Sequence, residues 1–210
     1  GVAIVNQLIF VYNLCLFGGV SGAGIFTAQF YGQGNHEGVR QTMRFKIWMV
    51  ALITIITCIL LLTLGETLIN AYLKGEGSTE SINATLSYGM NYLKIILIGL
   101  PAFALVQVYS STMRECGQTL LPMKSGIVAV FVNLILNYLL IYGKFGFPAL
   151  GVAGGAIATV VSRYVEMLII VIQVHRKNKE YPYIEGMYKT LQVPRELIRK
   201  IIIKGSPLLF

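Results

Sequence analysis

The 210-residue chain is 55% hydrophobic, only 12% of its residues are charged, and its mean hydropathy is +0.69. A soluble domain of this size cannot hide so much apolar surface, so the composition excludes an ordinary globular fold and predicts a protein that resides in lipid. The formal net charge of +8 could indicate nucleic-acid binding, but the positions of the charges, described below, favour a membrane protein.

The three cysteines, Cys15, Cys58 and Cys116, lack the clustered or paired spacing of a disulfide framework or a metal site. We therefore expect them to be small packing residues, and no motif in the chain indicates a catalytic residue or an enzyme. The chain begins at Gly1 without the basic region of a signal peptide and ends at Phe210 in an apolar segment. We expect it to be a fragment of a longer protein.

Five apolar segments are long enough to cross a bilayer as helices, which takes about 20 residues. The segments lie at about 5–29, 47–66, 92–113, 124–143 and 151–174. Only the fifth carries charged residues near its middle, Arg163 and Glu166. Strands are a poor alternative, because the segments show no apolar–polar alternation and because a helix in lipid satisfies its own backbone. The predicted fold class is all-α, a polytopic transmembrane helical bundle.

Turn-rich segments separate the spans, and one polar stretch follows them. The turn-rich segments are 32–38, 75–81 and 143–151. Residues 175–200 form the only long polar stretch, and it is rich in Lys and Arg. A short amphipathic helix should start near Pro194, since proline favours the first helical turn, with Leu197, Ile198 and Ile201 on one face. Residues 201–210 are predicted to start another transmembrane helix.

Lys and Arg gather in alternate connections between the spans. The basic connections are 30–46, 114–124 and 175–204. They hold most of the 17 Lys and Arg residues, whereas the connections around Lys74 and Lys144 hold few. Because cytoplasmic loops collect Lys and Arg, the basic connections are predicted to lie inside and the other two outside. This pattern explains the net charge without nucleic acid and predicts a multi-pass protein of the cell membrane, which we take to be a bacterial plasma membrane.

Three segments have a distinctive order and spacing. Segment 22–35 contains AQFYG, segment 133–138 reads NLILNY, and segment 151–163 contains GVAGGAIAT followed by SR. Together they resemble the second, fifth and sixth helices of the MATE family, the multidrug and toxic compound extrusion transporters. The resemblance implies helices two to six of the N-terminal lobe and the start of helix seven, about half of a twelve-helix, two-lobe transporter. It also implies that the basic stretch 175–200 is the cytoplasmic linker between the two lobes.

The family resemblance also implies a function. It predicts an antiporter coupled to Na⁺ or H⁺ that exports cationic or amphipathic drugs and other xenobiotics by alternating access. The implied partners are the lipid bilayer, a small-molecule substrate and the C-terminal lobe of the same chain, with no nucleic acid and no cofactor besides the coupling ion. Two alternatives stay open. One is a lipid-linked oligosaccharide flippase of the same superfamily, and the other is a non-transporting membrane scaffold.

Polar residues within the spans are the candidates for a substrate or cation cavity. They are Asn13, Gln29, Asn133, Asn137 and Thr159. Asn133 and Asn137 are four apart and share a helix face, so they could line a cavity or join two helices by hydrogen bonds. The resemblance matches Asn133 and Thr159 with polar groups of the family's cation site, and Asn137 with a position where some members carry Asp. An amide does not exchange a proton at physiological pH, which argues against an acid–base role for Asn137.

Arg163 and Glu166 place two charges inside the fifth span. A charge at the centre of a membrane helix costs roughly 2.5–3.5 kcal/mol on insertion scales, so such residues usually mark function. The two residues are three apart on one helix, and we expect an intramembrane ion pair with a structural or gate-side role. The alternative is that Glu166 binds the coupling ion directly.

Overall fold

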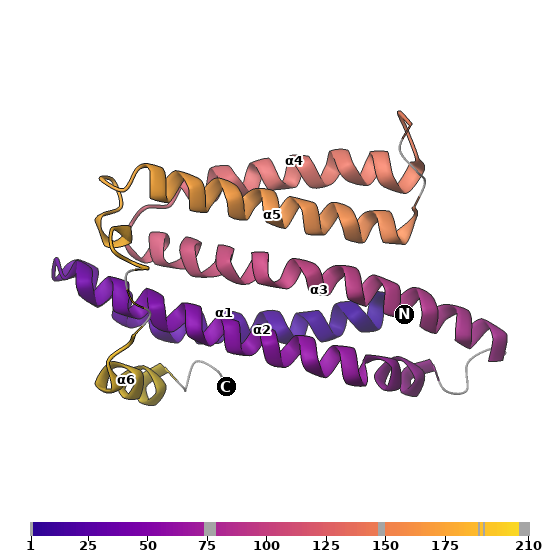
Figure 1. The fold of residues 1–210 in the computed structure, drawn as a ribbon, viewed down its shortest axis with the longest axis horizontal. Helices are drawn as coiled ribbons and strands as arrows, with labels where there is room; N and C mark the ends of the chain where they lie inside the picture. Colours follow the sequence, from indigo (N-terminus) through magenta and orange to yellow (C-terminus); the bar gives the residue numbers. More distant parts are fainter. Residues whose placement is uncertain (1, 74–78, 147–149, 189, 191, 206–210) are drawn as a thin grey trace.

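The computed structural model describes residues 2–73, 79–146, 150–188, 190 and 192–205, and its elements are helical (Figure 1). They are α1 (Val2–Gly32), α2 (His36–Leu73), α3 (Thr79–Glu115), α4 (Leu120–Tyr142), α5 (Val152–Arg176), the short 3-10 helix η1 (Pro182–Ile184) and α6 (Arg195–Gly205). The all-α fold class predicted from the sequence is confirmed.

The five long helices run roughly along one axis as a bundle. In Figure 1, α4 and α5 lie on one side, α1 and α2 on the other, and α3 lies between the two pairs. Each long helix contains a segment that is long and apolar enough to cross a membrane. The segments are Asn6–Gly32, His36–Gly65, Gly89–Glu115, Leu120–Tyr142 and Ala153–Arg176. Large apolar side chains such as Leu52, Phe131 and Leu134 are exposed, as expected where the solvent is lipid.

The helices extend beyond the predicted spans. Helix α2 continues through Glu66 to Leu73, and α3 starts at Thr79, well before the predicted 92–113 span. The reason is that a charged residue marks the edge of the hydrocarbon, whereas the helix itself continues into the headgroup region. Parts of two predicted turns, residues 74–78 and 147–149, lie outside the described residues.

The three basic connections lie at one end of the bundle. The turn between α1 and α2, the turn between α3 and α4, and the segment from the end of α5 to α6 are all at the left of Figure 1. The α4–α5 connection is at the opposite end. This arrangement is the one that alternating basic loops require if the basic end faces the cytoplasm.

Helix α6 forms the expected amphipathic segment. Leu197 and Ile201 are buried and pack against Ala23 and Phe26 of α1. The predicted division between a linker ending at 200 and a membrane span starting at 201 falls inside this helix. The difference arises because Ile201 continues the apolar face of Leu197 onto α1, so the apolar run does not begin a new element. Residues 206–210 lie outside the described residues.

Candidate functional site

A cavity of about 100 Å³ lies between α1, α3 and α5. Its polar lining includes Asn13 of α1 and Thr159 and Arg163 of α5, three residues that the sequence had singled out. Phe103 and Tyr92 of α3 contribute aromatic rings. The structure therefore brings together polar groups that lie on different helices and more than a hundred residues apart along the chain.

A second space of about 240 Å³ adjoins the cavity and shares Asn13 and Phe103 with it. It adds Gln107 of α3, which the sequence reasoning had not selected. A polar residue within the apolar run 95–113 is the signal that could have found it. We use "the polar cavity" for the lining residues Asn13, Phe103, Gln107, Thr159 and Arg163.

Arg163 and Glu166 are not joined as the sequence predicted. Among the described residues the ion pairs are Arg40–Glu37, Arg44–Glu37 and Lys46–Glu115. The guanidinium carbon of Arg163 instead lies 4.4 Å from the centroid of the Phe103 ring, a cation–π contact. Glu166 points toward α4, where its Oε1 is 3.8 Å from the position that a Cβ on Gly126 would take. Spacing of three residues permits an ion pair but does not impose one.

Asn133 and Asn137 lie at the interface of α4 with α5 and do not line the polar cavity. The Nδ2 of Asn137 donates to the Oδ1 of Asn133 at 3.0 Å. The Oδ1 of Asn137 faces Gly155 of α5, 3.6 Å from where a Cβ would stand. The Thr159 hydroxyl donates to the Gly155 carbonyl at 3.0 Å, so Asn137 and Thr159 both lie next to Gly155.

Gln29 is separate from the other candidates. Its side chain is exposed near the end of α1. Asn13 lies on the same helix sixteen residues earlier, which corresponds to ~24 Å along the axis. The structure therefore leaves Gln29 outside the polar cavity.

A buried polar cluster at the basic end of the bundle was missed by the sequence reasoning. Lys46 of α2 is completely buried. Its Nζ donates to Ser111 Oγ at 3.2 Å, to Thr112 Oγ1 at 3.1 Å and to Glu115 Oε2 at 2.6 Å. Glu115, at the end of α3, is the counter-charge that makes burial of this lysine tolerable.

Gly24 of α1 makes room for this cluster. A Cβ built on Gly24 would collide with the carboxylate of Glu115. Next to it, the hydroxyl of Thr27 donates to that of Thr42 at 3.0 Å, and both side chains are buried. The three helices α1, α2 and α3 are thus joined by polar contacts near the basic end of the bundle.

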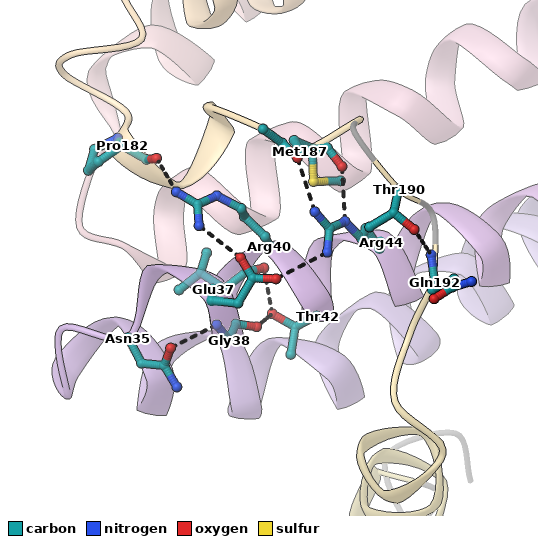
Figure 2. Close-up of polar contacts among 12 residues, drawn as sticks. Asn35, Glu37, Gly38, Arg40, Thr42, Arg44, Pro182, Met187, Thr190 and Gln192 are labelled. Carbon is teal, nitrogen blue, oxygen red and sulfur yellow. Dashed lines mark hydrogen bonds and ion pairs between the residues drawn. The ribbon is translucent and has the colours of Figure 1, made fainter.

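The segment after α5 is held against the bundle by two arginines of α2 (Figure 2). We call residues 177–188 the strap. Arg44 donates through Nε to the Met187 carbonyl at 2.9 Å and through Nη2 to the Gly186 carbonyl at 3.1 Å. Arg40 donates to the Pro182 carbonyl at 3.0 Å. Since backbone carbonyls are the acceptors, these contacts fix the path of the strap rather than the identity of its side chains.

Glu37 holds in place the two arginines of α2 that contact the strap. Its Oε2 lies 2.9 Å from Arg40 Nη1 and its Oε1 lies 3.3 Å from Arg44 Nη1 (Figure 2). Two of the basic residues counted for the positive-inside pattern therefore have structural partners.

The strap closes the basic end of the bundle with buried side chains. Tyr183, Ile184 and Met187 are almost fully buried. The Tyr183 hydroxyl donates to Gln118 Oε1 at 2.8 Å, and burial raises the pKa of Tyr183 above its ordinary value. Gln118 also donates to the Glu180 carbonyl at 2.7 Å. The strap is therefore packed as part of the bundle, although the sequence suggested only a polar linker.

Comparison with known sequences gives one family and several relatives. The MatE family model matches residues 1–139. A probable multidrug resistance protein NorM of Thermotoga maritima is 34% identical over 187 residues, which cover 89% of this chain and 39% of that protein. A probable multidrug resistance protein YoeA of Bacillus subtilis is 26% identical over 187 residues, which again cover 89% of this chain and 39% of that protein. The chain spans about two fifths of the length of these curated relatives.

Comparison with solved structures gives the same fold. A MATE protein in a bent conformation has a TM-score of 0.81 at 19% identity, covering 99% of this chain and 44% of that chain. An inward-facing MATE transporter of the MOP superfamily has a TM-score of 0.79 at 19% identity, covering 98% and 44%. An outward-facing one has a TM-score of 0.75 at 19% identity, covering 99% and 44%.

Proposed function

The chain belongs to the MATE family, a family of transporters, and on that premise we propose that it exports cationic or amphipathic compounds in exchange for Na⁺ or H⁺ by alternating access. The protein is a multi-pass membrane protein, and we place it in a bacterial plasma membrane. We propose that its partners are the bilayer, a small-molecule substrate and a second lobe. No enzymatic step and no cofactor besides the coupling ion is part of this proposal.

The polar cavity is the observation that carries the proposal. Asn13, Thr159 and Arg163 place amide, hydroxyl and guanidinium groups inside helices that are otherwise apolar. Polar groups at membrane depth are costly, so they are retained where they face a water-filled cavity or a substrate. Phe103 and Tyr92 add ring faces that suit the apolar part of an amphipathic compound.

The fold supports alternating access. The arrangement of the five long helices resembles both an inward-facing and an outward-facing relative to a similar degree. A set of helices that keeps its shape in both states can move as a rigid unit, as transporters of this kind require. The relatives named as multidrug resistance proteins support drugs as the substrate class.

For the coupling ion, the structure offers two kinds of group near the α4–α5 interface. The oxygens of the Asn133–Asn137 pair suit a metal cation such as Na⁺ and cannot exchange a proton. Glu166 of α5 is the ionisable group nearby and would serve H⁺. We therefore keep both ions in the proposal.

Export of a fluorescent cationic dye from proteoliposomes containing the full-length protein tests the proposal. We expect export only when a Na⁺ or H⁺ gradient is imposed. Asn13→Leu should lower the export rate about tenfold and Thr159→Val about fivefold, because each change removes one hydrogen-bonding group from the cavity.

Thr63→Val is the matched control for this experiment. Thr63 is exposed on α2, and its hydroxyl also donates to the carbonyl four residues earlier, Ile59 at 2.7 Å. The Thr63→Val substitution therefore removes the same kind of hydrogen bond within the helix as Thr159→Val does, but it leaves the cavity unchanged. Export that needs no gradient, or equal rates for Thr63→Val, Thr159→Val and Asn13→Leu, would contradict the proposal.

A further inference from the structure

An apolar groove of about 1040 Å³ runs between α2 and α6 at the basic end of the bundle. Trp48 and Leu52 of α2 form one wall, and Ile198 and Ile202 of α6 form the other. Arg195, at the start of α6, lies at the edge of the groove. The groove shares no lining residue with the polar cavity, which lies between α1, α3 and α5.

Helix α6 has two apolar faces with different surroundings. Leu197 and Ile201 are buried against α1, as described above. Ile202 is 57% exposed in the groove, opposite Trp48 and Leu52, which are 56% and 59% exposed. Because this groove adjoins a membrane-spanning segment of α2, a lipid acyl chain is the apolar partner that can cover the exposed faces of Leu52 and Ile202. Trp48 has the position of a residue in a membrane-interface belt.

The charges of α6 identify the kind of lipid. Arg195, Arg199 and Lys200 are all exposed, and Lys204 follows in the sequence. No ion pair among the described residues involves them. Clusters of four or more basic residues on an amphipathic helix at the cytoplasmic surface attract anionic headgroups. Glu196 is the acidic residue of this helix and leaves it with a net positive charge.

We propose that a phospholipid with an anionic headgroup binds in this groove, with an acyl chain between α2 and α6 and its phosphate at Arg195. The bound lipid holds α6 at the membrane surface and against the bundle, next to the strap. The proposal needs the basic end to face an anionic leaflet, but it does not depend on which substrate is transported or on the coupling ion.

Trp48, the single tryptophan of these 210 residues, provides the reporter. The full-length protein, with any tryptophan outside this region replaced by phenylalanine, is placed in phosphatidylcholine nanodiscs containing a small fraction of brominated lipid. Bromine quenches tryptophan fluorescence on contact. We expect brominated phosphatidylglycerol to quench Trp48 several-fold more strongly than brominated phosphatidylcholine at the same fraction.

Arg195→Gln should lower this preference for phosphatidylglycerol about fivefold, since one basic residue near the surface contributes about that factor. Arg176→Gln is the matched control, because Arg176 is also exposed at the basic end but lies outside the groove. The comparison of the two lipids with the unchanged protein needs no variant, so misfolding of Arg195→Gln cannot obscure the result.

Three outcomes would overturn the proposal. Equal quenching by both lipids would show that the groove does not select an anionic headgroup. No quenching by either lipid would show that a neighbouring helix or a second copy of the protein covers the groove. An equal loss of preference in Arg176→Gln and Arg195→Gln would show a diffuse charge effect. None of these measurements involves transport, so they stand apart from the test of the proposed function.

Discussion

Lys46→Met is expected to lower the free energy of unfolding by about 3–5 kcal/mol, because it leaves Glu115 without its counter-charge. The side chain of Glu115 is only 19% exposed, so water replaces the lost partner only in part. The hydroxyls of Ser111 and Thr112 also lose the hydrogen bonds that the Lys46 ammonium group donates to them. Denaturant unfolding of the purified protein in mixed micelles, followed by circular dichroism, measures the change.

Four further variants separate the buried pair from general effects of charge. Lys46→Met combined with Glu115→Leu should recover much of the lost stability, since removal of both charges leaves no unpaired ion. Gly24→Ala should also destabilise, because its methyl group collides with the Glu115 carboxylate, whereas Gly32→Ala meets no atom within 4 Å. Lys144→Met, at an exposed position, should change little. If Lys46→Met is as stable as Lys144→Met, the cluster does not stabilise the bundle.

Arg44→Ala is expected to release the strap. The substitution removes the donors to the Met187 and Gly186 carbonyls and the ion pair with Glu37. A hydrogen bond from a charged donor contributes about 1.5–3 kcal/mol, so loss of even one of them should speed local opening about 10- to 100-fold. Hydrogen exchange followed by mass spectrometry, on peptides that contain Ile184 and Met187, measures that opening.

Arg40→Ala and Arg199→Ala provide an intermediate case and a control for the faster hydrogen exchange of the strap. Arg40 makes one contact with the strap, to the Pro182 carbonyl, and its side chain is 21% exposed, so we expect a smaller acceleration. Arg199 is exposed on α6, and no ion pair or hydrogen bond among the described residues joins it to the strap, so we expect hydrogen exchange in the strap to be unchanged. Equal exchange in Arg44→Ala and Arg199→Ala would mean that packing of Tyr183 and Met187 alone holds the strap.

The sequence predicted the helices because apolar runs of membrane length leave few alternatives. The ends of the helices could not be predicted from the apolar runs, since α2 continues past Glu66 and α3 begins before the apolar part of its segment. Charged residues mark where hydrocarbon ends, whereas the backbone continues its hydrogen-bond pattern into the headgroup region.

The candidate site was only partly accessible from the sequence. Asn13, Thr159 and Arg163 could be selected from the sequence as polar residues in apolar spans. Whether they line one cavity depends on which faces of α1 and α5 point toward each other in the bundle. Asn133 and Asn137 were recognised as sharing a face, and the structure shows that this face meets α5. Neighbouring helices decide such contacts, and the spacing within one helix does not.

Lys46 shows a second limit. A rule that assigns basic residues to cytoplasmic loops treats each of them as exposed, and it therefore hid a buried lysine. The helical spacing held the missing signal. Val39, Met43, Lys46 and Val50 recur every three or four residues, and all four are buried.

Site-directed labelling of single cysteines in intact cells tests most directly that five helices cross the bilayer with the basic end inside. Cys15, Cys58 and Cys116 are first replaced by serine or alanine. Phe145→Cys, 85% exposed at the α4–α5 turn, should then react with a membrane-impermeant maleimide added outside. Glu185→Cys, exposed on the strap, should react only after the membrane is permeabilised. Labelling of both positions from the same side of the intact membrane would contradict the topology and, with it, the transporter proposed here.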